Sequence, residues 1–153
     1  NLMGNVFMRK TDDVFKIAKE ITKKITLKKS VDFSVVDFHG EITSEKMAIG
    51  HFFDGNASLV IGTHTHVPTS DAIILEKGTA YQTDAGMCGV YNSVIGMNKN
   101  NSINRFLKKE SQRHYPAVGE ATLCGSIVEC NVETGLANNI NQFIFGNGLK
   151  NSD

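Results

Sequence analysis

A strand–helix–strand pattern between residues 32 and 61 constrains the fold more than any other feature of the sequence. Residues 32–38 alternate well enough to predict a strand. Thr43-Ser44-Glu45 predicts a helix start, with the helix reaching Phe53 and its inner side formed by Met47, Ala48, His51 and Phe52. A short apolar strand is expected at residues 57–61. Because such alternation is typical of sheets covered by helices, the expected fold class is α/β (α+β).

Further elements are expected on both sides of this pattern. Upstream, Asp12 and Asp13 open an amphipathic helix with lysines in its last turn, and Ser30 ends it. Downstream, the predicted elements are a hairpin of residues 73–75 and 79–83, a short helix at residues 102–109, and a strand pair at residues 122–132 and 136–145. The sequence shows neither a linker nor a repeat, so we expect one mixed α/β unit.

Composition excludes several classes of protein. The 153 residues include sixteen basic and sixteen acidic side chains, which argues against a strongly basic nucleic-acid-binding protein. No apolar run approaches the roughly 18–20 residues needed to cross a bilayer, so no membrane partner is expected. The three cysteines, Cys88, Cys124 and Cys130, lack CxxC spacing. Their odd number argues against a disulfide framework and for a reducing compartment, so a cytoplasmic location is expected.

Three of the five histidines follow predicted strands and form the candidate site. His64 and His66 are two residues apart, and in an extended segment this spacing puts both side chains on one side. His39 ends another predicted strand, so parallel strands that end together would bring it near this pair. Neutral imidazoles bind divalent metal ions near pH 7. The sequence therefore predicts a partial metal site at His39, His64 and His66.

A His-X-His pair alone is weak evidence, because histidines with purely structural roles are common. The setting strengthens it here: Gly62 before the pair permits a tight turn, and Pro68 after it stiffens the exit. His51 and His114 are expected to be structural or solvated. Neither a GxSxG elbow nor a GxxxxGK[ST] loop occurs, and Cys88 has no evident base beside it.

Three consecutive motifs carry a family resemblance. They are Asp37-Phe38-His39-Gly40-Glu41-Ile42-Thr43-Ser44-Glu45-Lys46, Gly62-Thr63-His64-Thr65-His66-Val67, and Gly78-Thr79-Ala80-Tyr81-Gln82-Thr83-Asp84-Ala85-Gly86-Met87. In this order they resemble the bacterial YmdB-like metallophosphoesterases, calcineurin-like enzymes that act as 2′,3′-cyclic-nucleotide 2′-phosphodiesterases. The resemblance covers nearly the whole chain and implies a four-layer αββα sandwich.

The resemblance also implies a dinuclear centre of two divalent metal ions, often iron or manganese, with zinc as a further candidate. His39 and His64 would bind one metal ion and His66 the other. The metal ions would polarise the phosphoryl oxygens and lower the pKa of a bridging water, whose hydroxide would attack phosphorus in line. The implied substrate is a small cyclic nucleotide.

One departure from the family is large. Its N-terminal half carries Gly-Asp, Asn-Gly-Glu-Asn and Gly-Asn-His motifs, and none of them occurs here. Residues 1–153 would then be the C-terminal portion of a single metallophosphoesterase domain, half of the sandwich, with the N-terminal half as its missing partner. The proton donor is expected in that half, so no catalytic residue is assigned in this chain, which alone would be inactive.

Two alternatives remain open at the level of the sequence. A chain without its carboxylate ligands could be a non-catalytic interaction module that covers its exposed strand faces by forming a homo-oligomer. Three histidines could also bind zinc without turnover.

Overall fold

The computed structural model describes residues 1–108 and 113–150. A five-stranded sheet of order β1-β2-β3-β5-β4 lies beside a two-stranded ribbon, β6-β7. The strands are β1 (Leu2–Met3), β2 (Val35–His39), β3 (Leu59–Thr63), β4 (Ile73–Ile74), β5 (Ala80–Gln82), β6 (Leu123–Cys130) and β7 (Ala137–Phe145), and the helices are α1 (Val14–Lys24), α2 (Thr43–Phe53) and α3 (Lys99–Phe106).

The predicted strand–helix–strand pattern is confirmed as a parallel unit. β2 pairs with β3 in parallel register, with His39 opposite Thr63. β1 extends the sheet beside β2, and β5 extends it beside β3, both in parallel. The expected hairpin is also present, because β4 pairs with β5 in antiparallel register. Parallel strands place their carboxyl ends at one edge, and this edge carries the histidines.

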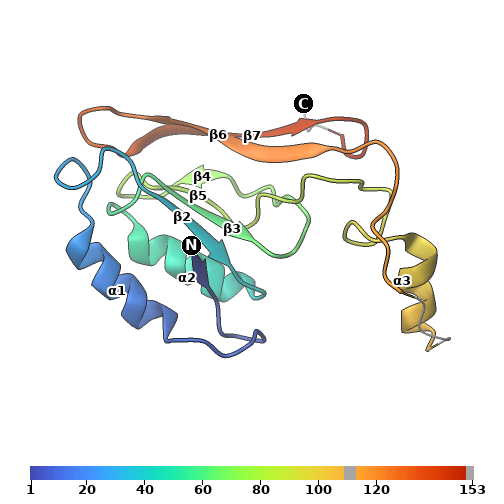
Figure 1. Cartoon of the computed structure of the whole chain (residues 1–153). Coiled ribbons are helices and arrows are strands. Elements are labelled where there is room, and N and C mark those ends of the chain that lie inside the picture. Colours follow the sequence, from blue (N-terminus) through green and yellow to red (C-terminus); the bar gives the residue numbers. More distant parts are fainter. Residues whose placement is uncertain (109–112, 151–153) are drawn as a thin grey trace.

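The central sheet has a layer on each of its faces, which makes a layered α/β arrangement (Figure 1). α1 and α2 cover one face, where Phe38, Val60 and Ile49 are completely buried. The β6-β7 ribbon covers the other face, where Ala80 packs with Ile140. The α/β class is therefore confirmed, with a helical layer, a sheet and a second sheet as expected for part of an αββα sandwich. α3 lies apart from these layers (Figure 1).

The first helix is shorter than predicted. Asp13 caps it as expected, because its carboxylate accepts from the N–H groups of Phe15 and Lys16. However, the helix ends at Lys24, and Ile25 is already extended. Ser30 closes a separate turn, in which its hydroxyl accepts from the N–H of Thr26 and donates to the carbonyl of Thr26. The prediction that the helix continues to Ser30 is wrong because this local turn competes with it.

The second helix has the predicted bounds but a different buried face. Its N-cap is Ile42, which makes no side-chain capping bond, so the capping role assigned to Thr43-Ser44-Glu45 is wrong. The buried positions are Glu45, Lys46, Ile49, Gly50 and Phe53, whereas the predicted inner residues Met47, Ala48 and His51 are exposed. The helix is rotated because buried polar contacts of Glu45 and Lys46 determine which side faces the sheet.

The remaining elements agree with the predictions apart from their bounds. α3 begins three residues earlier than expected, at Lys99, where the Asn98 side chain caps it; residue 109 lies outside the described part. β6 and β7 form the expected antiparallel pair. All three cysteines, which lie within the described residues, are free thiols. Within residues 1–108 and 113–150, no helix is both long enough and apolar enough to cross a membrane.

Candidate functional site

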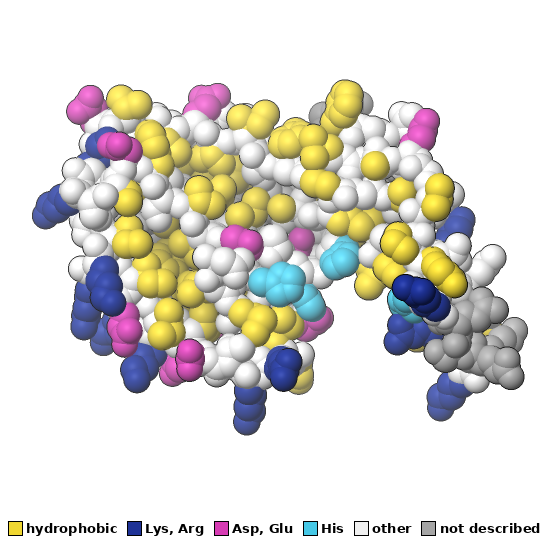
Figure 2. Space-filling view, in the orientation of Figure 1, with side chains coloured by type: hydrophobic (Ala, Val, Ile, Leu, Met, Phe, Trp, Pro, Cys, Tyr) yellow, Lys and Arg dark blue, Asp and Glu magenta, His cyan; other side chains and the backbone are white. Residues whose placement is uncertain are grey.

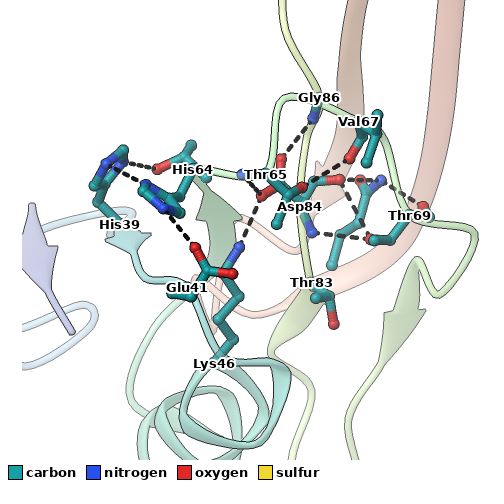
Figure 3. Close-up of polar contacts among 12 residues, drawn as sticks. His39, Glu41, Lys46, His64, Thr65, Val67, Thr69, Thr83, Asp84 and Gly86 are labelled. Atoms are coloured by element: carbon teal, nitrogen blue, oxygen red, sulfur yellow. Dashed lines mark hydrogen bonds and ion pairs between the residues drawn. The ribbon is translucent and has the colours of Figure 1, made fainter. Parts of the chain in front are cut away.

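Two of the three candidate histidines meet where β2 and β3 end. His39 is the last residue of β2, and His64 directly follows β3. Nε2 of His39 lies 3.0 Å from Nδ1 of His64, and the two rings are perpendicular, with centroids 4.8 Å apart. Figure 3 shows the two imidazoles turned toward each other. The parallel sheet thus brings together two nitrogen donors from residues 25 positions apart.

Hydrogen bonds on the outer nitrogens orient both rings. The Thr63 hydroxyl donates to Asp37 (2.9 Å), so its oxygen can accept from Nδ1–H of His39 at 3.0 Å. On the other ring, Nε2 of His64 lies 2.8 Å from a carboxylate oxygen of Glu41. In the tautomers that carry their protons on these outer nitrogens, both inner nitrogens offer lone pairs to a cation, which is how metal-binding histidines are commonly held; without a cation, the 3.0 Å separation of the inner nitrogens suits an N–H···N hydrogen bond. The pair therefore fits a divalent cation that accepts nitrogen ligands.

His66 is held separately from this pair. Its Nδ1 lies 2.9 Å from the carbonyl oxygen of Ile95, in the segment before α3. The backbone is not extended here, because φ is +110° at His64 and +65° at His66. The reasoning that placed both side chains on one side of an extended segment is therefore wrong. Within the described residues, no three His, Cys, Asp or Glu side chains form a group that could hold a metal ion.

A buried ion pair supports the loop that carries His64 and His66. The ammonium of Lys46 in α2 lies 2.7 Å from the carboxylate of Asp84, and each residue is only 1% exposed. The Asp84 carboxylate also accepts from the N–H groups of Thr65 (2.9 Å) and Gly86 (3.0 Å). Figure 3 shows these contacts converging on Asp84. Thr65 is the residue between His64 and His66, so this carboxylate fixes the backbone that carries both.

The same contacts determine the ionisation of Asp84. Burial alone would raise the pKa of this carboxyl, because a charge is costly away from water. The hydrogen bonds from Lys46, Thr65 and Gly86 outweigh burial and hold the pKa of Asp84 below its ordinary value. The carboxylate is consequently charged near neutral pH and can retain all three partners.

Gly62 has a different role from the one predicted. A Cβ atom there would lie 1.7 Å from the carbonyl oxygen of Thr83, so the glycine is required by the close approach of the segment after β5. This close approach also brings Ala85 within hydrogen-bonding distance, because its N–H donates to the Gly62 carbonyl (2.9 Å). Position 62 is therefore glycine because of this close backbone approach and not because of the predicted tight turn.

The sequence predictions missed the supporting residues Glu41, Lys46 and Asp84. All three residues occur within the motifs of the family resemblance, where the carboxylates of Glu41 and Asp84 could have indicated support for the histidines. The pairing of Lys46 with Asp84, 38 positions away, had no such signal because it follows from packing.

The sequence of the chain matches one family of proteins. The family model described as YmdB-like protein matches residues 1–143, and the chain belongs to this family. Among curated relatives, it is 42% identical over 144 residues to the 2′,3′-cyclic-nucleotide 2′-phosphodiesterase of Bacillus subtilis, a match that covers 94% of this chain and 54% of the relative. The chain therefore spans about half the length of the relative.

Solved structures support the same fold. A hypothetical protein from Thermus thermophilus aligns with a TM-score of 0.84 and 40% identity, covering 94% of this chain and 55% of the other. A novel phosphatase from Mycoplasma pneumoniae aligns with a TM-score of 0.84 and 37% identity, covering 94% of this chain and 51% of the other.

Proposed function

We propose that this chain supplies the histidine ligands of a dinuclear metal centre that hydrolyses 2′,3′-cyclic nucleotides. The main supporting observation is the pair of His39 and His64. Their outer nitrogens are hydrogen-bonded, and their inner nitrogens face each other at 3.0 Å. The name of the Bacillus subtilis relative supports the choice of substrate.

In this proposal, His39 and His64 hold one metal ion and His66 holds the other. The Ile95 carbonyl supports the second assignment, because it can accept a hydrogen bond from Nδ1–H and leave the lone pair of Nε2 of His66 for the metal ion. Two bound divalent ions, iron or manganese or alternatively zinc, would supply charge stabilisation for the phosphoryl oxygens and a water of lowered pKa.

The other residues of the site act as positioning groups. The Thr63 hydroxyl links the Asp37 carboxylate to the His39 ring through two hydrogen bonds, and Glu41 orients the His64 ring. Asp84 holds the N–H of Thr65, so the histidines on either side keep their places while substrate binds. The contacts of Thr63 and Glu41 limit ring rotation, and the contact of Asp84 limits backbone motion, which together lower the entropy lost on binding a ligand.

We also propose that the proton donor and the carboxylate ligands come from outside residues 1–153. Support comes from the missing Gly-Asp, Asn-Gly-Glu-Asn and Gly-Asn-His motifs and from the coverage of about half of the relative. In this view the chain is the C-terminal portion of one domain and is inactive alone. A cytoplasmic location and a homo-oligomeric state remain predictions.

The test uses the complete gene product that carries this chain. The double substitution His64→Ala and His66→Ala should lower the turnover of 2′,3′-cyclic AMP at least about 100-fold and reduce the bound metal measured by elemental analysis. His51→Ala is the matched control, because His51 is an exposed histidine in α2 and its substitution should change neither quantity.

Three outcomes would reject the proposal in different ways. Unchanged turnover in the double variant would show that these histidines are not metal ligands of the catalyst. Retained zinc without hydrolysis by the unsubstituted protein would favour a zinc site. A metal-free protein that only self-associates in sedimentation would favour a non-catalytic interaction module.

A further inference from the structure

A cavity of about 350 Å³ lies beside α3. Its volume is within the range of small-molecule sites, roughly 300–1,000 Å³. Apolar side chains of Val94, Ile95 and Met97 form part of its wall. Phe106 and Arg105, from the last turn of α3, line it as well. The cavity therefore combines apolar side chains with one phenyl ring and one cation.

Ser102 indicates that the cavity receives a polar atom. This residue lines the cavity and is 4% exposed, yet its hydroxyl has no hydrogen-bond partner among the described residues. A buried hydroxyl without a partner is costly, and such groups are rare in folded proteins. A ligand that offers a donor or acceptor to Ser102 would remove this cost.

The cavity is coupled to the candidate metal site through Ile95. The Ile95 side chain lines the cavity, and its carbonyl oxygen contacts Nδ1 of His66 at 2.9 Å. Ile95 has a φ of +49°, which is an unfavourable value for a β-branched residue. Figure 2 shows the surface hollowed between the main body and the α3 lobe, with histidine side chains along the hollow.

We infer that this cavity binds the base of the cyclic nucleotide whose phosphate is bound at the histidines; the inference rests on the proposed function. A base has two apolar faces and a polar edge. Its faces match Phe106 and the apolar wall, and its edge can reach the Ser102 hydroxyl. Bases in proteins are commonly stacked on aromatic rings or guanidinium groups and hydrogen-bonded at their edges. A purely apolar ligand would leave Ser102 unpaired.

Arg105 is held in place by a neighbouring side chain. Its guanidinium hydrogen-bonds to Nε2 of His114, which lines the same cavity. A guanidinium held in this way can present its planar face to a base without losing much further entropy. Because the base and the phosphorus of a nucleotide are joined through one ribose, the cavity and His66 would bind parts of a single ligand.

The first test measures binding of adenosine, which has a base but no phosphate, to the complete gene product by NMR titration. Phe106→Ala should weaken adenosine binding about tenfold, within the range for one base stacked on an aromatic ring, and Ser102→Ala should also weaken it. Ile103→Ala is the matched control, because Ile103 is exposed on the same helix. Since Phe106 is 83% exposed, its truncation should leave the fold intact. Wild-type chain that does not bind adenosine, or variants that bind it equally well, would overturn the inference.

The second test separates this inference from the proposed function. In the complete gene product, Phe106→Ala should raise KM about tenfold for 2′,3′-cyclic AMP and leave KM unchanged for ribose 2,3-cyclic phosphate, which lacks the base. Equal changes for the two substrates would overturn the inference. If neither substrate is hydrolysed by the wild-type enzyme while adenosine binding depends on Phe106, the proposed function fails and the base site stands.

Discussion

The buried Lys46–Asp84 pair should be one of the strongest single contributors to stability. In Lys46→Met, the Asp84 carboxylate would remain 1% exposed without its cation. Removing one partner of a buried ion pair costs about 3–5 kcal/mol. The carboxylate keeps the N–H groups of Thr65 and Gly86, so we expect the lower end, about 3 kcal/mol. For a domain of this size, that loss of stability lowers the midpoint temperature of thermal unfolding by roughly 6–12 °C.

The assay is urea and thermal unfolding of the chain, followed by circular dichroism. The double variant Lys46→Met/Asp84→Asn should lose less stability than the sum of the single variants, because neither charge is then buried alone. Lys28→Met is the matched control, since Lys28 pairs with Asp32 at 2.6 Å on the exposed surface; it should leave the midpoint unchanged. A loss below about 1 kcal/mol for Lys46→Met, or additive single variants, would refute the reasoning.

The pH dependence follows from the lowered pKa of Asp84. A carboxyl whose pKa is lower in the folded than in the unfolded chain contributes its full stability above the unfolded value, about 3.9. This contribution is lost as the pH falls through the lowered folded value. The stability difference between wild type and Asp84→Asn should therefore be constant near neutral pH and shrink below about pH 4.

Two further predictions concern the ends of β2 and β3. Thr63→Val removes the hydroxyl between Asp37 and His39 and should weaken metal binding by the complete gene product about 10–100-fold, measured by competition with a chelator. The control is Thr22→Val, on the exposed surface of α1. Equal metal affinities of the Thr63 and Thr22 variants would contradict the role of Thr63. Gly62→Ala would place a Cβ 1.7 Å from the Thr83 carbonyl and should lower the thermal unfolding midpoint of the chain. A variant with the wild-type unfolding midpoint would show that the segment after β5 can move away.

Several features of the fold followed from short stretches of sequence. The strand–helix–strand pattern predicted β2, α2 and β3, because apolar periodicity reflects how each element buries one side. The positions of His39 and His64 at strand ends predicted their proximity, since parallel strands place equivalent ends together. The order of the motifs also indicated the family, which the match over residues 1–143 confirms.

Local signals were less informative where two conformations compete. The lysine-rich end of α1 was predicted to be helical up to Ser30, but the Ser30 hydroxyl forms its own turn with Thr26. The inner face of α2 was also misplaced, because a polar residue such as Lys46 is normally counted as solvated. Its buried partner lies 38 positions away, so nothing in the neighbouring sequence identifies it.

The sequence by itself therefore determined the α/β class, the family and the three candidate histidines. The tertiary structure decided how those histidines are arranged: His39 and His64 face each other, whereas His66 turns to the Ile95 carbonyl beside the α3 cavity. The physical reason is that periodicity and motif order depend on neighbouring residues. The positive φ values of His64 and His66 and the support from Asp84 exist only when segments distant in sequence pack together.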